Sequence, residues 1–268
     1  MEKKFDIKVL KGGPEYATTH EDWFAIPYTV LSVSKKFSGK TVSISQFCQI
    51  QHAQGKLDRI IMISPTYEQN KHCFVGLPID EENDIIQPSV ESAQIVMDKL
   101  DQEALEYDQY KEKLQKWKDL QTYLKTNKNI EDLDDELLMT FGSNLEKPKP
   151  KYPNNRKPVI VCVMDDCQGT EAFSSKSKLS YLTIKHRHLG LTVDGAIGCN
   201  LIIMVQTYMS SSLGLPRSVR SNMTLLCLFQ NRNQKELDQI AAECSGEVSP
   251  EVFLKLHEKA CSTPYMAS

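Results

Sequence analysis

The sequence predicts an α/β fold in which a mostly parallel central sheet is flanked by helices. Its first sign is a set of short apolar runs, rich in β-branched or bulky residues, at 28–33, 59–64, 159–164, 201–206 and 223–229. None of them alternates cleanly between apolar and polar residues, as expected for strands buried on both faces. Helical stretches separate the runs, and this alternation is typical of a parallel sheet covered by helices.

The composition is that of a globular protein. The chain has 268 residues, of which 40% are hydrophobic and 25% are charged, enough to bury a sizeable core. We expect residues 1–268 to form a single domain. A net charge of −3 and a pI near 6.1 exclude an overall attraction to nucleic acid or anionic membranes, although a local basic patch remains compatible with them.

Nothing in the sequence predicts a secreted or membrane-spanning protein. No signal peptide is visible at the N-terminus, and no apolar stretch approaches the ~20 residues that span a bilayer. The 8 cysteines form no C-x-x-C pair, and several lie in apolar runs. We interpret them as reduced core residues of a soluble intracellular protein.

Helices are predicted between and after the apolar runs, at 40–52, 177–189, 234–243 and 250–260. Asn233 and Glu236 form the N-cap and third-position pair of the helix over 234–243. Ser249 and Pro250 occupy the cap and first position of the last helix.

Residues 87–150 have a different character and are predicted to be a helical insertion between the second and third strands. Residues 90–125 are dense in Glu, Lys, Gln and Leu and predict a long amphipathic helix. An acidic patch and a Lys-Pro-Lys-Pro linker follow. Two interpretations remain open, namely a solvated helical hairpin packed on the core and an element that contacts a partner or another subunit.

The segment after the first apolar run resembles a phosphate-binding loop. It fits the pattern G-x-x-x-x-G-K-[ST], except that a serine replaces the first glycine. Backbone N–H groups of such a loop, together with a helix N-terminus, hold the phosphates of a nucleotide. The predicted nucleotide-binding residues are Ser34, Lys35, Lys36, Phe37, Ser38, Gly39, Lys40 and Thr41.

Two residues of this loop have expected roles in binding ATP and Mg²⁺. Lys40 would reach the β- and γ-phosphates, and Thr41 would offer its hydroxyl to Mg²⁺. Ser34 is the departure from the pattern, because glycine adopts unusual backbone angles readily and serine does so only at a cost in free energy. A surface loop without a ligand is the alternative interpretation.

The third apolar run ends in two acidic residues and resembles a Walker B motif. Asp165 is expected to hold the Mg²⁺ shell, and Asp166 to orient and polarise the attacking water. The alternative is a strand that ends at an Asp-rich turn. The 125 residues between Lys40 and Asp165 are a long separation, which the helical insertion explains.

Two further residues are candidates for catalysis. Gln206 ends the fourth run, and ligands of open α/β sheets bind at the carboxyl ends of strands, so its side chain would touch the γ-phosphate or its water. Arg220 would act as a finger on the nucleotide of a neighbouring subunit, with Arg217 as the weaker candidate. A polar strand end and a solvated arginine are the alternatives. The basic cluster at 185–188 is interpreted as a solvated face, and DNA or subunit contact is its alternative.

In this order, the motifs resemble the viral DNA-packaging ATPases of the FtsK–HerA superfamily, the poxvirus-type ATPases of large DNA viruses and virophages. The resembling segments are SKKFSGKT, RIIMISPT, VIVCVMDD, KHRHLGL leading to LIIMVQT, and LPRSVRSNMTLLCLF followed by Asn231, Glu236 and Leu237. They cover most of the chain outside the insertion and the N-terminal segment. The phosphate loop and the acidic pair are generic, whereas the succession from RHLGL to LPRSVRSN is more specific.

The resemblance implies a P-loop NTPase of the additional-strand type that forms a homo-oligomeric ring of five or six subunits. Such a ring hydrolyses ATP with Mg²⁺ and drives double-stranded DNA into a preformed capsid through its portal vertex. By match, Asp166 is the base, Gln206 the sensor and Arg220 the trans finger. The implied location is the host-cell cytoplasm, at the viral factory, or the virion. The serine at position 34 and a lengthened connection at 192–200 depart from the family pattern.

Other functions remain open at this stage. A different FtsK–HerA-type translocase or helicase would share every catalytic element. A nucleotide-binding assembly or scaffold protein would instead bind ATP weakly or not turn it over, and its insertion would be the working surface.

Overall fold

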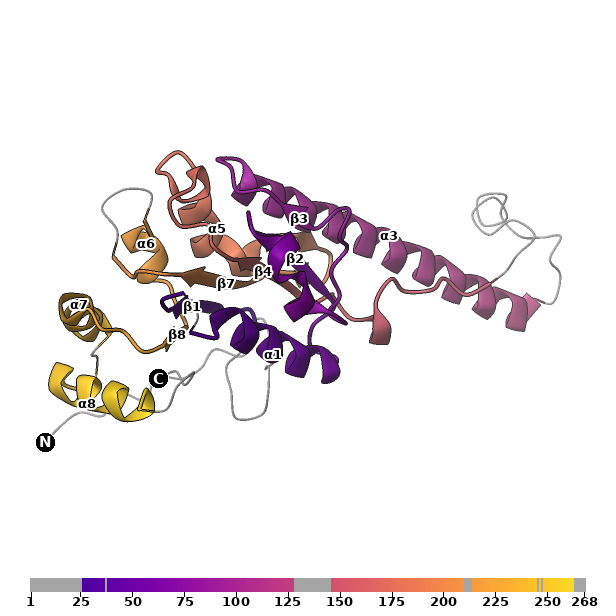
Figure 1. Ribbon diagram of the computed structural model, residues 1–268. Helices are drawn as coiled ribbons and strands as arrows, with labels where there is room; N and C mark the ends of the chain where they lie inside the picture. The colour runs from indigo at the N-terminus through magenta and orange to yellow at the C-terminus, as the bar shows by residue number, and fades with distance from the viewer. Residues whose placement is uncertain are drawn as a thin grey trace, which may run out of the picture.

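The computed structural model describes residues 26–36, 38–127, 146–209, 214–244, 246 and 248–262. Its centre is a parallel six-stranded sheet with the order β3-β2-β4-β7-β1-β8 (Figure 1). The strands are β1 (Thr29–Val33), β2 (Arg59–Ile63), β3 (Ile85–Ile86), β4 (Ile160–Met164), β7 (Asn200–Val205) and β8 (Leu225–Leu228). Each of the five predicted runs coincides with one of them, although β7 begins one residue before its run, at Asn200. The edge strand β3 was not predicted, because two residues are too short a run to show a pattern.

The order of the strands defines the fold. The strand β7 lies between β1, which leads into the phosphate loop, and β4, which ends in the acidic pair. One additional strand therefore separates the two motif-bearing strands. This is the α/β P-loop NTPase fold that the sequence predicts.

Both faces of the sheet are buried, which explains why the strand sequences do not alternate. In β4, Cys162 and Met164 belong to one hydrophobic cluster, whereas Val161 and Val163 belong to the other. The helix α1 (Lys40–Ala53) covers one face, and α3 (Ser92–Asn127) and α5 (Leu179–Lys185) cover the opposite face (Figure 1). Continuous apolar runs are the pattern that such double coverage requires.

The remaining elements are shorter. The chain also forms α2 (Tyr67–Asn70), α6 (Arg217–Arg220), α7 (Gln234–Cys244), α8 (Pro250–Ala260), and the 3-10 helices η1 (Lys71–Phe74), η3 (Pro153–Asn155), η4 (Glu171–Phe173) and η5 (His186–His188). The predicted helices over 234–243 and 250–260 are confirmed, and Ser249 caps the latter by accepting a hydrogen bond from the Val252 amide. The helix predicted over 177–189 begins two residues later and ends in η5.

A small hairpin occupies the lengthened connection before β7. The strands β5 (Leu191–Thr192) and β6 (Gly195–Ala196) pair antiparallel and pack against α3. Gly190 allows this approach because it has a φ of +63°, and an added Cβ would lie 2.8 Å from the Leu100 carbonyl oxygen. The connection at 192–200, which departs from the family pattern, thus contains a defined hairpin that packs against α3.

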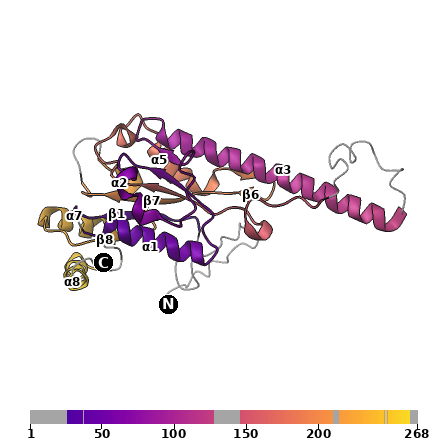
Figure 2. The same ribbon diagram turned by 45° about the vertical axis from the view of Figure 1, so that its right-hand side comes forward.

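The helix α3 has 36 residues, which corresponds to a length of about 54 Å. Its first turns pack in the core through residues such as Val96 and Leu100, and the rest projects beyond the sheet (Figures 1 and 2). A buried ion network holds the base of this helix. Arg59 lies at the start of β2. Its guanidinium nitrogens are 2.7 Å from a carboxylate oxygen of Asp84, just before β3, and 2.7 Å from one of Glu103 in α3. Within the described residues, no helix is long and apolar enough to cross a membrane.

The basic cluster at 185–188 differs from its prediction as a solvated face. Lys185, Arg187 and His188 are exposed, but His186 is buried. Its Nδ1 lies 2.7 Å from the Cys199 carbonyl oxygen, which links η5 to the segment before β7. The short helix α5 ends at Lys185, and the other three residues of the cluster form η5, so the four side chains do not share one helical face.

Candidate nucleotide-binding site

The predicted site residues gather at the carboxyl edge of the sheet, because three neighbouring parallel strands end there. Ser34 follows β1, Asp165 and Asp166 follow β4, and Gln206 follows β7. The backbone hydrogen bonding of the sheet continues one residue past β1 and β4. The amide of Ser34 donates to the carbonyl oxygen of Val205 over 3.0 Å, and the amide of Asp165 donates to the carbonyl oxygen of Ile63 over 3.0 Å. These bonds fix where each polar side chain leaves the sheet.

The phosphate loop turns into α1 at Gly39. This residue is the N-cap of α1 and has a left-handed conformation with a φ of 85°, which favours glycine. Ser34, by contrast, does not have a positive φ. In the described part of the chain, the non-glycine residues with a positive φ are Asn155 and Asp166. The serine in place of the first glycine therefore needs no unusual backbone angle. Phe37, also predicted to belong to the loop, lies outside the described residues.

The ammonium group of Lys40 lies between the two aspartates of the acidic pair. Its Nζ is 3.7 Å from Asp165 Oδ1 and 3.6 Å from Asp166 Oδ1. Asp165 is buried, and burial raises its carboxyl pKa above the usual value; Lys40 opposes this rise and Asp166 adds to it. A divalent cation at this carboxylate would stabilise its charged form.

The side chain of Asp166 is held at both oxygens. Oδ1 accepts a hydrogen bond from Gln206 Nε2 over 3.3 Å, and Oδ2 accepts one from Thr66 Oγ1 over 3.4 Å. The backbone of Asp166 has a φ of 52°, a left-handed conformation that aspartate tolerates better than most residues and that often occurs at functional sites. The contact between Asp166 and Gln206 joins two residues that were predicted separately.

A residue that was not predicted, Gln168, connects the ends of β4 and β7. Its Oε1 accepts hydrogen bonds from the amides of Gln206 (3.0 Å) and Thr207 (3.1 Å). Its Nε2 donates to the Thr207 carbonyl oxygen (3.0 Å) and hydroxyl (2.6 Å). Gln168 thereby sets the position of Gln206 relative to Asp166. Nothing in the sequence marks a glutamine two residues beyond the acidic pair for this role.

Two adjoining cavities share Asp166 and Gln206. The first, of about 300 Å³, is lined by the loop residues Lys35, Lys36 and Ser38 to Thr41, and by residues of α2 and η1, namely Asn70, His72 and Cys73. The second, of about 260 Å³, extends along Gln168, Gly169 and Thr207. The α2–η1 wall was also not predicted, because no local pattern connects residues 70–73 with the phosphate loop.

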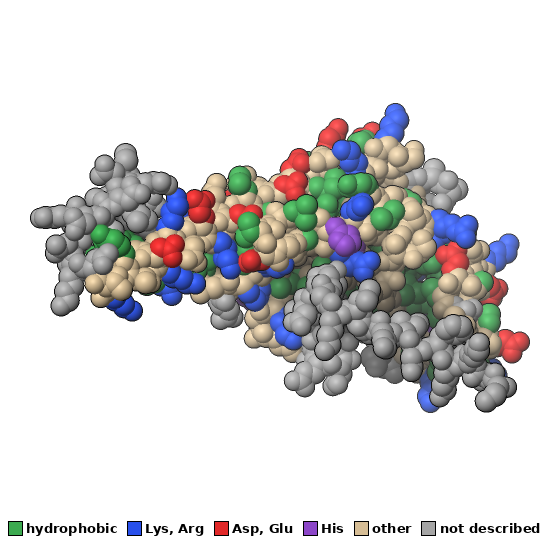
Figure 3. Space-filling view, turned by 180° about the vertical axis from the view of Figure 1, so that it is seen from behind, with side chains coloured by type: hydrophobic (Ala, Val, Ile, Leu, Met, Phe, Trp, Pro, Cys, Tyr) green, Lys and Arg blue, Asp and Glu red, His purple; other side chains and the backbone are tan. Residues whose placement is uncertain are grey.

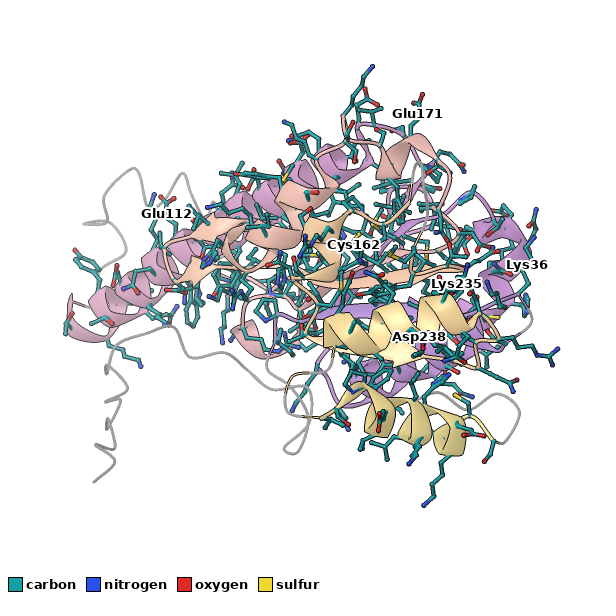
Figure 4. The ribbon with its side chains drawn as sticks, turned by 90° about the vertical axis from the view of Figure 1, so that its left-hand side faces the viewer. Lys36, Glu112, Cys162, Glu171, Lys235 and Asp238 are labelled. Atoms are coloured by element: carbon teal, nitrogen blue, oxygen red, sulfur yellow. The ribbon has the colours of Figure 1, made fainter. Side chains whose placement is uncertain are left out.

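The donor set fits a nucleotide with Mg²⁺. Among the described residues, the buried Ser38 Oγ and Asp165 Oδ1 have no hydrogen-bond partner. Thr41 lines the same cavity. Hydroxyl and carboxylate oxygens are the ligands that Mg²⁺ prefers, and it completes its shell with water and phosphate. Lys36 extends from the outer surface at this end of the molecule, far from Glu112 on the projecting part of α3 (Figure 4).

Arg220 does not join this cluster within its own chain. Its guanidinium donates to the Glu243 carboxylate (3.1 and 3.3 Å) and to the Leu215 carbonyl oxygen, and it lies over the Tyr208 ring. Arg217, the weaker candidate, is exposed. A finger acts on the nucleotide of another subunit, so the role of Arg220 stays a prediction. The geometry shows that Arg220 would first have to leave Glu243.

The resembling residues Asn231 and Glu236 support the segment after β7. The buried Glu236 accepts hydrogen bonds from the amides of Tyr208 (2.6 Å) and Met209 (3.2 Å) and from Asn231 Nδ2 (2.6 Å). Its own amide donates to the predicted cap Asn233 over 3.4 Å. Glu236 thus anchors the exit of the strand that carries Gln206 and does not contact the cavity itself.

Comparison with known proteins gives a weak structural similarity. No family model matches the sequence, and no curated protein is similar to it. The chain is similar to the pCW3 conjugation coupling protein TcpA, in its monomer form with ATPgS, at 17% identity and a TM-score of 0.40. The match covers 78% of this chain and 51% of that one, so the chain spans about half the length of that protein. A similarity of this size does not define a family, a substrate or a partner.

Proposed function

We propose that this chain is an ATPase whose site is the carboxyl-edge cluster. The observation that supports this most strongly is the convergence of Lys40, Asp166 and Gln206, from three neighbouring strand ends, on one cavity. A phosphate loop alone is a common surface sequence. A lysine, a held carboxylate and a polar strand end within contact distance form a set that suits phosphoryl transfer to water.

The residues of the site have separate tasks in this proposal. Mg²⁺ supplies charge neutralisation at the β- and γ-phosphates when the nucleotide is bound. Lys40 and the loop amides hold the phosphates, while Thr41 and Asp165 provide oxygen ligands for the metal. Asp166 orients a water and accepts its proton. Gln206, fixed by Gln168, sets the direction of the Asp166 carboxylate and contacts the γ-phosphate or the water.

We further propose that ATP hydrolysis drives a DNA motor of the FtsK–HerA type, packaging double-stranded viral DNA into a preformed capsid. The succession from RHLGL through MVQT to LPRSVRSN supports this task, and the strand order accommodates it. The motor would be a ring of five or six subunits at the portal vertex, with Arg220 as trans finger. It would work in the host-cell cytoplasm, at the viral factory, or on the virion.

Two alternatives lead to different expectations. A translocase or helicase of the same superfamily with a cellular or plasmid task has the same catalytic residues. A scaffold protein with weak or absent turnover was suggested by Ser34, but that residue adopts an ordinary backbone conformation. The structure therefore removes the main reason for expecting a defective loop.

One measurement separates these cases, namely the ATPase rate with and without double-stranded DNA, recorded together with the oligomer mass. A motor shows turnover that rises with DNA and with ring assembly. ATP binding without turnover in any assembly state supports the scaffold protein. No ATP binding at millimolar concentration contradicts both the motor and the ATPase proposals.

The substitution Asp166→Asn tests the assignment of the base. The amide retains the shape and a partner for Gln206 but does not accept a proton, so turnover should fall by roughly 10²-fold or more. ATP binding, measured by calorimetry with Mg²⁺, should change little because Lys40 and the loop are intact. A variant that hydrolyses ATP at the wild-type rate would show that Asp166 is not the base.

A further inference from the structure

A larger cavity lies at the opposite, amino edge of the sheet. Its volume is about 630 Å³, compared with about 300 Å³ at the phosphate loop. The segments that precede β1, β4 and β7 form it together with the end of α1, η5 and the β5–β6 hairpin. The strands here have five or six residues, which places the two edges roughly 16 Å apart. None of the residues assigned to ATP lines this cavity.

Cations dominate among the charged residues of the described lining. It contains Lys56, Arg156, Lys157 and Arg187, with His188 beside them, and Asp194 is its one carboxylate. That carboxylate is already engaged, because Asp194 Oδ2 lies 2.9 Å from Lys111 Nζ and accepts a hydrogen bond from the Tyr107 hydroxyl. These bonds hold the pKa of Asp194 below its usual value. Its charge is thus compensated mainly from α3, outside the cavity, with a smaller contribution from Lys157.

Among the lysines and arginines that line the cavity, Arg156 alone forms an ion pair with a carboxylate of the described residues. Arg156 forms a two-point ion pair with Asp58, with distances of 2.6 and 3.1 Å. Lys157 instead donates to two carbonyl oxygens, those of Asp194 and Ala196, at 3.0 Å each. In the described part of the chain, neither Lys56 nor Arg187 forms an ion pair. Three positive charges therefore face one cavity of a protein whose net charge is −3.

Most of the remaining lining is apolar, apart from Gln54 and Asn200. Ile26, Pro27, Val159, Ile197 and Leu191 contribute to it. Gly198 has a φ of +72°, and an added Cβ would lie 2.7 Å from Pro27 Cγ, so the wall is closely packed at this point. Seen from behind, hydrophobic side chains lie beside Lys and Arg and a histidine near the base of α3 (Figure 3). A ligand that suits this lining has a flat apolar body and an anionic group.

We propose that the amino-edge cavity binds a nucleotide unit, either as a free nucleoside monophosphate or within a single-stranded nucleic acid. The phosphate would contact Lys56, Lys157 and Arg187, and the base would lie against the apolar wall and stack on the ring of His188. This inference goes beyond ATP hydrolysis and does not depend on it.

The test uses the full chain with Lys40→Met, so that the phosphate loop does not contribute to binding. The probes are a fluorescent nucleoside monophosphate and a short fluorescent single-stranded oligonucleotide, both without Mg²⁺. We expect Lys56→Glu combined with Arg187→Glu to weaken binding by at least about tenfold, because two charge-assisted contacts become repulsive. For the oligonucleotide, the salt dependence should also fall by about 0.7 in log–log slope per removed cation.

The matched control combines Arg232→Glu with Lys235→Glu, which changes the net charge equally. Both residues are exposed and lie outside the cavity, with Lys235 on the outer side of α7 (Figure 4). We expect this control to bind within about twofold of the parent protein. Thermal unfolding checks that each variant is folded, and Lys56→Gln with Arg187→Gln replaces the charge reversal if that variant unfolds.

Each outcome decides the proposal. Binding of the mononucleotide that only the cavity variant weakens supports a free-nucleotide site, and binding of the oligonucleotide alone supports a unit within a strand. An equal loss in both double variants, or no loss in either, overturns the proposal. Inorganic phosphate that competes as well as the mononucleotide overturns the role of the apolar wall. ATP binding by the wild-type chain is measured separately, so a failure here leaves the ATPase proposal standing.

Discussion

The two edges of the central sheet differ in how their positive charges are compensated. At the carboxyl edge, Lys40 lies between Asp165 and Asp166, so the chain itself supplies the counter-charges. At the amino edge, Lys56, Lys157 and Arg187 face a cavity whose one described carboxylate is paired elsewhere. A phosphate that enters the first site meets two carboxylates as well as a lysine. A phosphate that enters the second site meets mainly cations.

This difference has a consequence for metal dependence. A triphosphate and two aspartates repel one another unless a divalent cation lies between them, so the carboxyl edge should bind its ligand together with Mg²⁺. The amino edge already has uncompensated cations and should need no metal. Binding of phosphate-containing ligands is thus expected to depend on Mg²⁺ at the carboxyl edge of the sheet and to be independent of it at the amino edge.

Removal of Mg²⁺ is the most direct way to break this comparison and has the largest expected effect. With excess chelator, ATP turnover should stop, and ATP affinity should fall by roughly tenfold or more, because Asp165 and Asp166 lose their counter-ion. Nucleoside monophosphate binding by the Lys40→Met chain should not change. Calorimetry with and without chelator measures both, and equal metal dependence at the two edges would contradict the charge argument.

Gln168 offers a smaller and more local test, confined to the carboxyl edge. The substitution Gln168→Met removes four hydrogen bonds that join the ends of β4 and β7, and it should destabilise the fold by about 1–3 kcal/mol in urea unfolding. Gln206 then loses its fixed position beside Asp166. We expect kcat to fall by roughly tenfold while the Kd for Mg²⁺-ATP stays the same.

The control for this variant is Gln168→Glu, which retains the acceptor for the amides of Gln206 and Thr207 but loses the donor and adds a negative charge. It should recover part of the lost turnover. A Gln168→Met variant with an unchanged kcat would show that Gln206 is positioned by other contacts, such as the bond to Asp166 itself.

The sequence predicted the carboxyl edge better than the amino edge for a physical reason. Parallel strands end at the same edge, so polar residues that directly follow apolar runs, such as Asp166 and Gln206, must lie near one another. Thr66 and Gln168 were not predicted as site residues because their contacts depend on turns beyond the strands. Their side-chain directions follow from the tertiary fold and not from any local pattern.

The amino edge could not be predicted because its residues come from segments without a common motif. Lys56 follows a helix, Lys157 precedes a strand, and Arg187 belongs to a cluster that was interpreted as a solvated face. They meet only because β2, β4 and β7 are neighbours in the sheet. The helix α3 was predicted within about two residues of its ends, since its 36 residues are dense in the helix-favouring Glu, Lys, Gln and Leu.

The pH dependence of stability sharpens the comparison further, with the smallest expected effect. His186 lies behind the wall of the amino-edge cavity and is close to the Cys199 carbonyl oxygen. Burial lowers its pKa, and the bond to Cys199 opposes this only in part. The native state therefore binds fewer protons than the unfolded state, whose histidine pKa is about 6.5. Stability should be constant above that value and decrease as the pH falls through it, by at most about 1.4 kcal/mol per pH unit.

The variant His186→Gln separates this contribution from those of other groups. Glutamine retains a donor for the Cys199 carbonyl oxygen and does not titrate, so its unfolding free energy should depend less on pH between about 5 and 7. His257 also has a pKa lowered by burial and contributes a slope of the same sign, so the relevant quantity is the difference between variant and wild type. Equal slopes for His186→Gln and wild type in urea unfolding would mean that His186 takes up its proton without disturbing the wall of the cavity.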